Sequence, residues 1–471
     1  MSALLLALIS APVSADWFEE IKKTATDEQL HQLLYEMPKG GDLHHHLTGS
    51  IFSEWWYELA LASKNKGYRY YTKVKIDNCR KHGDAFFDQY LIHYQNVVEG
   101  KWKKLPACER AEYLPLDALD DSQLRAWHDA LRLDKPHEGR NEFFDRHWQR
   151  LGDLARDPNI LVGILLKNFE SFSEEGLIYA EPQVNVAGLM QADTTPIHPS
   201  EAAAIVRESL KGKKFVETGM TWRFQMAILR FVPQAEEHLR WAYQFVSENE
   251  PWVAVNMVGR EDNDKGYPAR FLPTIRSLRH RYNDVRLSIH AGEVDEPNSH
   301  IRDTLLLGAD RIGHGVNLIT DPDMMRLMRH GPYMVEINLI SNLLLEYVDD
   351  YSQHPFPEYL RTGIPVALST DDRGMWDSTL TDEFFVAVRE FNLSWAEIKQ
   401  LSENSLKYAF VPAEIRKELL ERYRKNIQRF ERRLDRKGVQ ALDRTPSPKR
   451  GFICRQYELC APPDVQNDSS I

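Results

Sequence analysis

The sequence predicts an α/β protein built on a (β/α)8 TIM barrel, with an insertion after the first strand-helix unit and a helical C-terminal extension. Eight short apolar runs alternate with helical stretches, which is the pattern of such a barrel. No Gly-x-Gly-x-x-Gly loop follows the first strand, which argues against a doubly wound open sheet, the competing architecture. A length of 471 residues suits one barrel with insertions.

The N-terminus predicts export. Residues 1–15 form a short apolar run that ends in small residues, as in a signal peptide cleaved before Asp16. The run is too short to span a bilayer, and it lacks the usual positive N-terminal region, so a frayed apolar terminus is the alternative. We therefore expect a secreted or periplasmic protein.

The four cysteines are even in number, as expected of an exported chain with disulfides. They allow three connectivities, of which the sequence-close one, Cys79–Cys108 with Cys454–Cys460, is the natural pairing. If the chain is not exported, they are ordinary thiols.

The predicted domains follow the chain in order. Residues 16–36 have helical spacing, and the run Met37-Pro38-Lys39-Gly40-Gly41 stops that helix and starts the first strand. The barrel covers residues 37–410, and an insertion rich in Lys, Arg and Tyr occupies 64–140. Residues 411–471 are expected to form a C-terminal helix and a tail that is loosely held apart from its cysteine loop. The predicted strands are 42–47, 177–184, 222–229, 253–258, 285–290, 311–313, 333–337 and 365–369.

Charge and hydropathy indicate the kind of partner. The net charge of −11 and the pI of about 5.9 provide no basic surface for nucleic-acid phosphates, which favours a small-molecule partner. Apart from the N-terminal run, no stretch is typical of a membrane span. The oligomeric state stays open, with a homodimer among the options.

Three consecutive histidines lie on the first predicted strand. Alternate side chains of a strand point to opposite faces, so His44 and His46 share one face about 7 Å apart while His45 faces away. Two imidazoles on one face can share a metal ion. Taken alone, the pattern favours histidines that only make local hydrogen bonds.

Later strands also end in residues that bind metals or transfer protons. The fifth strand ends with His290 and Glu293, the sixth with His314, and the eighth with Asp371 and Asp372. In a barrel these ends meet at one face, where active sites lie. Taken singly, each residue has a structural explanation, such as a core histidine, a helix N-cap or a surface carboxylate. Taken together they predict a zinc site, whose ligands would be His44, His46, His290 and Asp371.

At this point the sequence resembles the adenosine/AMP deaminase branch of the metal-dependent amidohydrolases. The resemblance spans residues 37–410 and rests on four strings, His44-His45-His46-Leu47-Thr48-Gly49, His290-Ala291-Gly292-Glu293, Arg311-Ile312-Gly313-His314-Gly315 and Ser369-Thr370-Asp371-Asp372. The export segment, the cysteine-bearing insertion and shorter strings such as Met37-Pro38-Lys39-Gly40 also resemble the secreted subgroup, the adenosine deaminase-related growth factors.

The resemblance implies a role for each matching residue. His44, His46, His290 and Asp371 match the ligands of one zinc ion per chain. Glu293 matches the acid that protonates N1 of the purine, and His314 the histidine beside the attacking hydroxide. Asp372 matches the carboxylate that bonds N7, and Gly259 the glycine whose backbone meets N3.

The chain also departs from the family pattern at four places. Thr48 stands where intracellular enzymes have an aspartate that contacts the ribose 5′-hydroxyl. Asn256 stands where an aspartate is common, Asn338-Leu339 replaces Cys-Pro, and Arg373 replaces a proline. None of these positions matches a zinc ligand, the acid or the hydroxide partner, so the departures bear on the substrate more than on the chemistry.

The sequence thus predicts zinc-dependent hydrolytic deamination of adenosine and 2′-deoxyadenosine to inosine and 2′-deoxyinosine, with release of ammonia. One alternative is a deaminase of another aminopurine, a nucleotide or a modified nucleoside, which Thr48 motivates. The other is a catalytically weak secreted binding or signalling protein on the same barrel. The complete set of six catalytic and ligand residues favours an enzyme over a binder.

Overall fold

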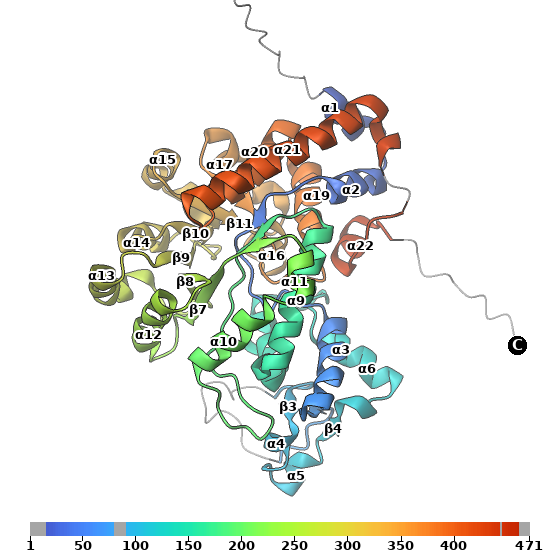
Figure 1. The fold of residues 1–471 in the computed structure, drawn as a ribbon, viewed down its shortest axis with the longest axis vertical. Helices are drawn as coiled ribbons and strands as arrows, with labels where there is room; N and C mark the ends of the chain where they lie inside the picture. The colour runs from blue at the N-terminus through green and yellow to red at the C-terminus, as the bar shows by residue number, and fades with distance from the viewer. Residues whose placement is uncertain (1–15, 80–90, 443–444, 461–471) are drawn as a thin grey trace, which may run out of the picture.

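The computed structural model describes residues 16–79, 91–442 and 445–460, and the predicted signal peptide, residues 1–15, lies outside these ranges. Short parallel strands form the centre of the molecule and helices surround them (Figure 1). One strand of the barrel is interrupted at Arg223 and therefore has two labels, β6 and β7. The strands of the barrel are β1 (Gly41–Asp42), β5 (Tyr179–Ala180), β6 (Thr221–Trp222), β7 (Phe224–Leu229), β8 (Trp252–Val258), β9 (Arg286–Ala291), β10 (Arg311–His314), β11 (Met334–Ile337) and β12 (Val366–Leu368).

Hydrogen-bonded pairing closes these strands into a ring. One sheet has the order β12-β11-β10-β9-β8-β7 and another the order β1-β5-β6, all parallel. Two isolated parallel bridges join the sheets, His45 with Asp371 and Gln183 with Gln225. The eight-stranded barrel is therefore confirmed, and every predicted strand overlaps an observed one.

The first strand is shorter than the predicted range 42–47. The Asp42 side chain accepts a hydrogen bond from the backbone N–H of His44 at 3.1 Å, and this local bond replaces regular strand pairing. Pairing then resumes only at single bridges, as at His45 and His46. The histidines consequently lie on irregular backbone, although their side chains still alternate.

Helices form the outer layer. Between the strands lie α3 (Ser53–Ser63), α9 (Pro158–Glu174), α10 (Pro199–Ser209), α11 (Lys213–Glu217), α12 (Ala235–Glu248), α13 (Leu272–Arg281), α14 (His300–Leu307), α15 (Pro322–His330), α16 (Leu339–Leu344) and α17 (Phe356–Thr362), and after the last strand α18 (Arg373–Trp376), α19 (Leu380–Phe391) and α20 (Trp395–Lys407). Single 3-10 turns in the loops are η5 (Pro268–Phe271), η6 (Val316–Thr320) and η7 (Tyr351–Gln353).

The N-terminal helix α1 and the long C-terminal helix α21 pack on the same side of the barrel (Figure 1). Trp395 of α20 contacts Trp17 at the N-terminus and stacks on Phe430 near the C-terminus, with ring centroids 4.9 and 5.9 Å apart. The N-terminal helices are α1 (Asp16–Thr24) and α2 (Asp27–Glu36), and the C-terminal extension consists of α21 (Ala413–Lys437), η8 (Gly438–Ala441) and α22 (Gly451–Tyr457).

The expectation of a tail that is loosely held apart from its cysteine loop is wrong for residues 445–453. Helix α22 buries Phe452 and Ile453 against the core. Arg450, just before it, forms an ion pair with the nearly buried Asp377 at 2.6 Å. The tail is polar in composition overall, but burial of these two apolar side chains is enough to dock a helix of seven residues.

The insertion has a sheet of its own. Strand β2 (Tyr70–Lys73) pairs in antiparallel fashion with β3 (Asn96–Val98) and β4 (Tyr113–Pro115), and Tyr71, Val97 and Tyr113 form a small separate core. The predicted disulfide Cys79–Cys108 is present, as is Cys454–Cys460 in the tail. The other elements of the insertion are η1 (Lys64–Lys66), α4 (Glu99–Trp102), α5 (Ala107–Arg110), η2 (Leu116–Ala118) and α6 (Asp121–Ala130).

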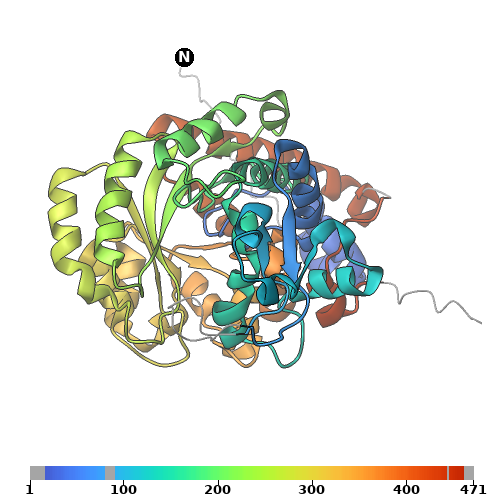
Figure 2. The same ribbon diagram turned by 90° about the horizontal axis from the view of Figure 1, so that it is seen from below.

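The insertion lies over the end of the barrel at which the strands finish. The Tyr68 hydroxyl donates to the carbonyl of Met190, which belongs to the loop after β5. Figure 2 shows the cyan insertion in front of the barrel when the molecule is seen from below. The predicted boundaries of domain and insertion stay predictions.

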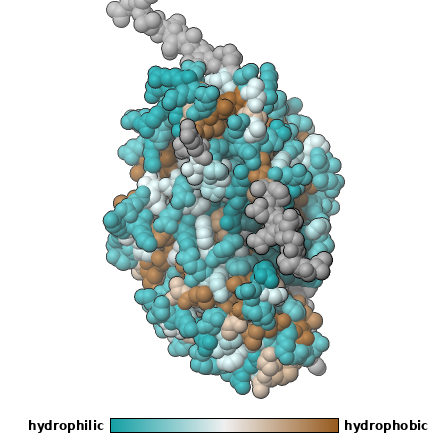
Figure 3. All heavy atoms as spheres, turned by 90° about the vertical axis from the view of Figure 1, so that its right-hand side faces the viewer, coloured by the Kyte–Doolittle hydropathy of each residue, from teal (hydrophilic) through white to brown (hydrophobic). Residues whose placement is uncertain are grey.

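One face of the molecule is mostly polar (Figure 3). Figure 3 shows one face on which hydrophobic groups are scattered among hydrophilic ones. No helix among the described residues is long and apolar enough to cross a membrane.

Candidate active site

Four of the predicted residues meet where the strands end. His44 and His46 follow β1, His290 lies in β9 and Asp371 follows β12. His46 Nε2 is 3.2 Å from His290 Nε2, and Asp371 Oδ1 is 3.4 Å from His44 Nε2 and 3.3 Å from His46 Nε2. Zinc bonds of about 2.0–2.1 Å place the corners of a tetrahedron about 3.3 Å apart, so these donor atoms have the spacing of zinc ligands.

The hydrogen bonds of His44 and His290 leave their Nε2 atoms facing the site. His44 Nδ1 contacts the Glu336 carboxylate at 2.7 Å, which can only accept, so Nδ1 carries the hydrogen. His290 Nδ1 lies 3.0 Å from Asn256 Oδ1 and donates to it. The Asn256 orientation is set by Gln225, whose Oε1 accepts from Asn256 Nδ2 at 2.9 Å. Both imidazoles are thereby oriented as metal ligands.

His314 lies in the same cluster but has the opposite tautomer. The backbone N–H of Phe356 donates to His354 Nδ1, so His354 Nε2 carries a hydrogen and donates to Asn342 Oδ1 at 3.1 Å. Asn342 Nδ2 then donates to His314 Nδ1 at 3.0 Å. Burial lowers the pKa of His314 to about 3, so its ring is neutral and its one hydrogen is on Nε2. His314 therefore offers a hydrogen-bond donor to the site and no lone pair.

Two geometric groupings of the site residues are possible. One contains His44, His290, His314 and Asp371, with ligand atoms within 4.8 Å of one another, and the other contains His46, Asp371 and Asp372. The tautomers remove His314 from the first group. Burial and the neighbouring Asp371 raise the pKa of Asp372, which disfavours the ionised form that a metal ligand needs, so the predicted set of His44, His46, His290 and Asp371 is left.

We call the four predicted ligands, His44, His46, His290 and Asp371, the metal cradle. Some of its buried polar atoms have no hydrogen-bond partner among the described residues. His44 Nε2 and Asp371 Oδ1 are two of them, whereas the other oxygen of Asp371 accepts from the Ser341 hydroxyl at 2.7 Å. Burial alone would lower the pKa of His44, but Asp371 and Glu336 raise it to about 10. A cation bound at His44 Nε2 displaces that proton, so metal affinity must fall as the pH falls. The residues fit a zinc ion.

Glu293 follows β9 and is buried beside the cradle. Burial and the nearby charge of Asp371 hold the pKa of Glu293 well above its usual range. Its carboxyl group lies 3.8 Å from His314 Nε2 and accepts from the Tyr347 hydroxyl at 3.5 Å. A buried carboxyl group that keeps its proton at neutral pH can act as a general acid.

Asp372 is a second buried acid. Burial and the neighbouring Asp371 raise its pKa well above the usual range, and its Oδ1 has no hydrogen-bond partner in the described part of the chain. A Cβ atom at Gly49 would lie only 1.6 Å from this oxygen, so the glycine of the first motif makes room for the Asp372 side chain. The protonated acid can donate to an acceptor nitrogen.

A cavity of about 350 Å³ joins these residues, which is within the range of small-molecule sites. The predicted substrate-binding residues Thr48, Gly259 and Asp372 line it together with Glu293. Arg230 fixes the Gly259 peptide by donating to its carbonyl oxygen at 3.1 Å. The structure thus brings all predicted site residues together, and Glu293, His314 and Asp372 surround the metal cradle.

Sequence reasoning missed one wall of the cavity. It consists of Phe143, Phe144 and Trp148, from the π-helical turn η3 (Phe143–His147) and the helix α8 (Trp148–Leu151). The short α7 (Arg140–Glu142) precedes this wall and η4 (Gly152–Arg156) follows it. The signal in the sequence was a group of three aromatic residues just after the insertion.

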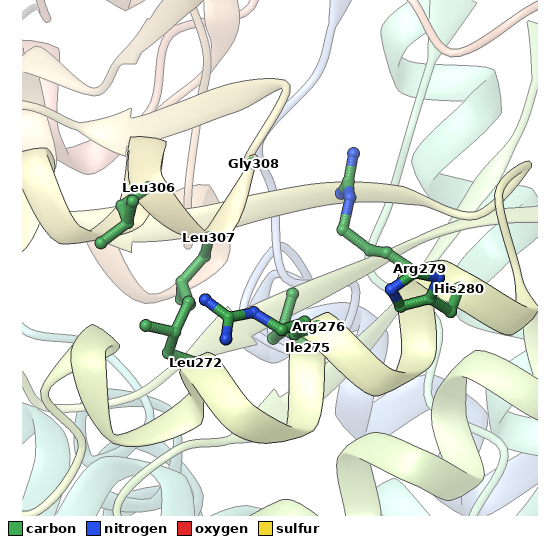
Figure 4. Close-up of a pocket in the computed structure, with 8 residues that line it drawn as sticks. All are labelled: Leu272, Ile275, Arg276, Arg279, His280, Leu306, Leu307 and Gly308. Atoms are coloured by element: carbon green, nitrogen blue, oxygen red, sulfur yellow. The ribbon is translucent and has the colours of Figure 1, made fainter.

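Another hollow lies outside the barrel, between α13 and α14. It has a volume of about 370 Å³ and is lined by Leu272, Ile275, Arg276, Arg279, His280, Leu306, Leu307 and Gly308. Figure 4 shows its side chains on helices rather than at strand ends. Among the described residues, no carboxylate and none of the predicted site residues line it.

A (β/α)8 barrel with three imidazoles and a carboxylate at its strand ends has the architecture of a metal-dependent amidohydrolase. Comparison with known proteins narrows this class. The family profile described as "Adenosine deaminase" matches residues 112–426, and the chain belongs to the adenosine deaminase family. The growth-factor subgroup stays a prediction.

Individual curated relatives match only part of this chain, at modest identity. An adenosine deaminase of Serratia proteamaculans is 34% identical over 146 residues, which are 31% of this chain and 44% of that enzyme. The chain spans about half the length of several of the curated relatives that it matches.

Two examples illustrate the solved structures that share the fold. One is a zinc-bound amidohydrolase from Burkholderia ambifaria, with a TM-score of 0.62, 17% identity and coverage of 87% of this chain and 94% of that one. The other is the apo N6-methyl-AMP deaminase of Arabidopsis thaliana, with a TM-score of 0.60, 21% identity and coverage of 85% and 98%.

The tautomers predict that, of two histidine substitutions in the cluster, one lowers the zinc content and the other leaves it unchanged. His290→Ala removes a ligand and should lower zinc affinity by more than the roughly 10–100-fold that loss of an outer partner costs. His314→Ala, the matched control in the same cluster, should keep one zinc per chain. Metal analysis after dialysis against a chelator measures both. Zinc loss in His314→Ala, or full zinc in His290→Ala, would contradict the assigned ligand set.

Proposed function

We propose that this protein is a zinc-dependent enzyme that hydrolyses adenosine and 2′-deoxyadenosine to the inosine nucleosides and ammonia. The observation that carries the proposal is the buried Glu293 carboxyl group, whose pKa burial raises, in the wall of a cavity that also contains residues of the metal cradle and Asp372. These groups can act on one purine ring from three sides. Membership of the adenosine deaminase family supports the same reaction.

The residues of the chain divide the work of the reaction. His44, His46, His290 and Asp371 would hold a zinc ion, which would supply hydroxide at neutral pH when bound. Glu293 transfers its proton to N1, which withdraws electrons from C6 and prepares it for attack. His314 donates its Nε2–H to the oxygen that adds at C6, which holds that oxygen in place.

Asp372 and Gly259 orient the base. The protonated Asp372 donates to N7, which is an acceptor, and the Gly259 backbone N–H donates to N3. Oxygen adds at C6, the amino group leaves with a proton as ammonia, and C6 becomes the carbonyl of the product. Water is the co-substrate, so the equation balances without an oxidant or reductant.

The lining of the cavity favours a nucleoside over a nucleotide. None of the described residues that line it is Lys or Arg, and three of them, Glu293, Asp371 and Asp372, are acids. A phosphate buried there would lack the Arg or Lys partners that phosphates normally find. The neutral sugar of a nucleoside meets no such cost. The binding-protein alternative is disfavoured because all catalytic and ligand positions are filled.

A substrate panel tests the proposal directly. We expect the zinc-loaded protein to deaminate adenosine and 2′-deoxyadenosine, with kcat/KM for AMP lower by more than about tenfold because the phosphate is unpaired. Ultraviolet absorbance and ammonia release follow the reaction, with adenine included to measure the contribution of the sugar. Turnover of AMP above adenosine would favour the nucleotide alternative, and no turnover of any compound would favour a binder.

Removing the acid should separate chemistry from binding. Glu293→Gln keeps the shape of the side chain but has no acidic proton, so kcat for adenosine should fall by roughly 10²–10⁴-fold. Zinc content and thermal stability serve as controls and should stay close to those of the wild type. Near-normal turnover in this variant would refute the role of Glu293.

The chain of hydrogen bonds behind His314 predicts an effect at a distance. In His354→Leu, nothing holds the Asn342 amide, which can then turn its oxygen toward His314 and reverse the tautomer. We expect kcat to fall by roughly 10–100-fold with zinc retained. His354→Gln, whose amide still donates to Asn342, is the matched control and should recover most of the activity. Equal loss in both variants would argue for a packing role instead.

A further inference from the structure

One buried amide in the cavity has no assigned role. Gln183 follows β5, is only 4% exposed and lines the same cavity as Thr48 and Asp372. Neither its Nε2 nor its Oε1 has a hydrogen-bond partner among the residues that the structure describes, although its backbone is firmly held. The backbone N–H donates to His45 O at 2.9 Å, and the carbonyl accepts from Leu47 N at 3.3 Å.

A buried amide that is unpaired at both ends is costly, and native proteins seldom leave one without a reason. Two other glutamines near the site are partnered. Gln225, one layer deeper in the barrel, donates to the carbonyl of Leu43 and accepts from Asn256. Gln149 lines the cavity but donates to Asp145 O at 2.6 Å. The Gln183 amide is thus available to a ligand.

The place of Gln183 around the barrel identifies the part of the ligand that it faces. The base contacts of the proposed function follow β9 (Glu293 at N1), β8 (Gly259 at N3) and β12 (Asp372 at N7). In a purine, N3 and N7 flank the glycosidic nitrogen N9, which lies opposite N1. The sugar on N9 therefore points into the arc from β12 through β1 and β5 to β7, the arc that contains Gln183.

We propose that the Gln183 side chain binds the hydroxyl groups of the ribose and makes the enzyme selective for ribonucleosides. A primary amide presents one donor side and one acceptor side, which matches two adjacent hydroxyls, one accepting and one donating. The 2′,3′-diol of ribose is such a pair, whereas a 2′-deoxyribose or 3′-deoxyribose leaves half of the amide unpaired. Gln183 acts on substrate choice and not on the reacting atoms.

This inference rests on the proposed function, and its test separates the two. The zinc-loaded wild type, Gln183→Met and Gln149→Met are assayed with adenosine, 2′-deoxyadenosine and 3′-deoxyadenosine. Wild-type kcat/KM should be roughly tenfold higher for adenosine than for either deoxynucleoside, because each leaves a buried polar group unpaired. In Gln183→Met that ratio should fall to within about twofold. The Gln149→Met control should keep the wild-type ratio, because its amide is already bonded to the protein.

Binding and stability give readouts that do not depend on turnover. The dissociation constants of purine riboside and purine 2′-deoxyriboside, which lack the amino group, should differ in the wild type and converge in Gln183→Met. The Tm of Gln183→Met should equal or exceed that of the wild type, because a methionine of similar length replaces an unpaired amide. A purely structural glutamine would instead lower Tm and leave the ratio of substrates unchanged.

The outcomes distinguish the two claims. If the wild type deaminates no aminopurine, the proposed function fails. If it deaminates adenosine but shows no preference for the ribose, or if Gln183→Met keeps the preference, the inference about Gln183 fails alone. Loss of the preference in both methionine variants would also overturn it.

Discussion

The metal cradle depends on a buried charge at the centre of the barrel. Arg311 pairs with Glu181 at 2.6 Å and with Glu336 at 2.5 Å, and its guanidinium also lies over the Phe410 ring at 3.7 Å. Burial opposes these charges, but the two carboxylates raise the pKa of Arg311, and Arg311 lowers that of Glu336. Glu336 therefore stays ionised without access to water and orients His44. Removing one member of such a set typically costs 3–5 kcal/mol, because an uncompensated charge is left.

Hydrogen-bond partners outside the site likewise give histidines of the same cluster different roles. His44 and His290 have acceptors at Nδ1, a carboxylate and an amide oxygen, so Nε2 is the nitrogen that can bind a cation. His314 has a donor at Nδ1, because a backbone N–H sets the direction of every hydrogen bond leading to it. Partners outside the site thus decide which imidazole binds a metal ion and which donates a hydrogen.

The strands and the ligand residues could be predicted from the sequence, but the hydrogen bonds that orient the ligands could not. The apolar runs predicted all eight strands, and the residues that follow them predicted the cradle, because the ends of parallel strands must meet at one face. The donors and acceptors behind the cradle could not be predicted. Glu336 contacts His44 from 292 residues away in sequence, and His354 contacts Asn342 from 12 residues away. Both contacts exist only in the folded protein. The aromatic wall at Phe143 follows an insertion whose path no periodicity indicates.

The residues of the reaction and the residues around the sugar also lie on different kinds of backbone. The cradle is held by barrel pairing. Its ligand Asp371 and the adjacent His314 both have left-handed backbone, with φ of 52° and 64°. Each such conformation costs about 1–3 kcal/mol and persists only where the surroundings enforce it, which makes these positions hard to move. Thr48 and the aromatic wall lie beyond the strands, where substitutions disturb less. A family can therefore keep the reaction while the residues around the sugar diverge, and the departures from the family pattern in this chain, Thr48 among them, lie outside the cradle and the acid.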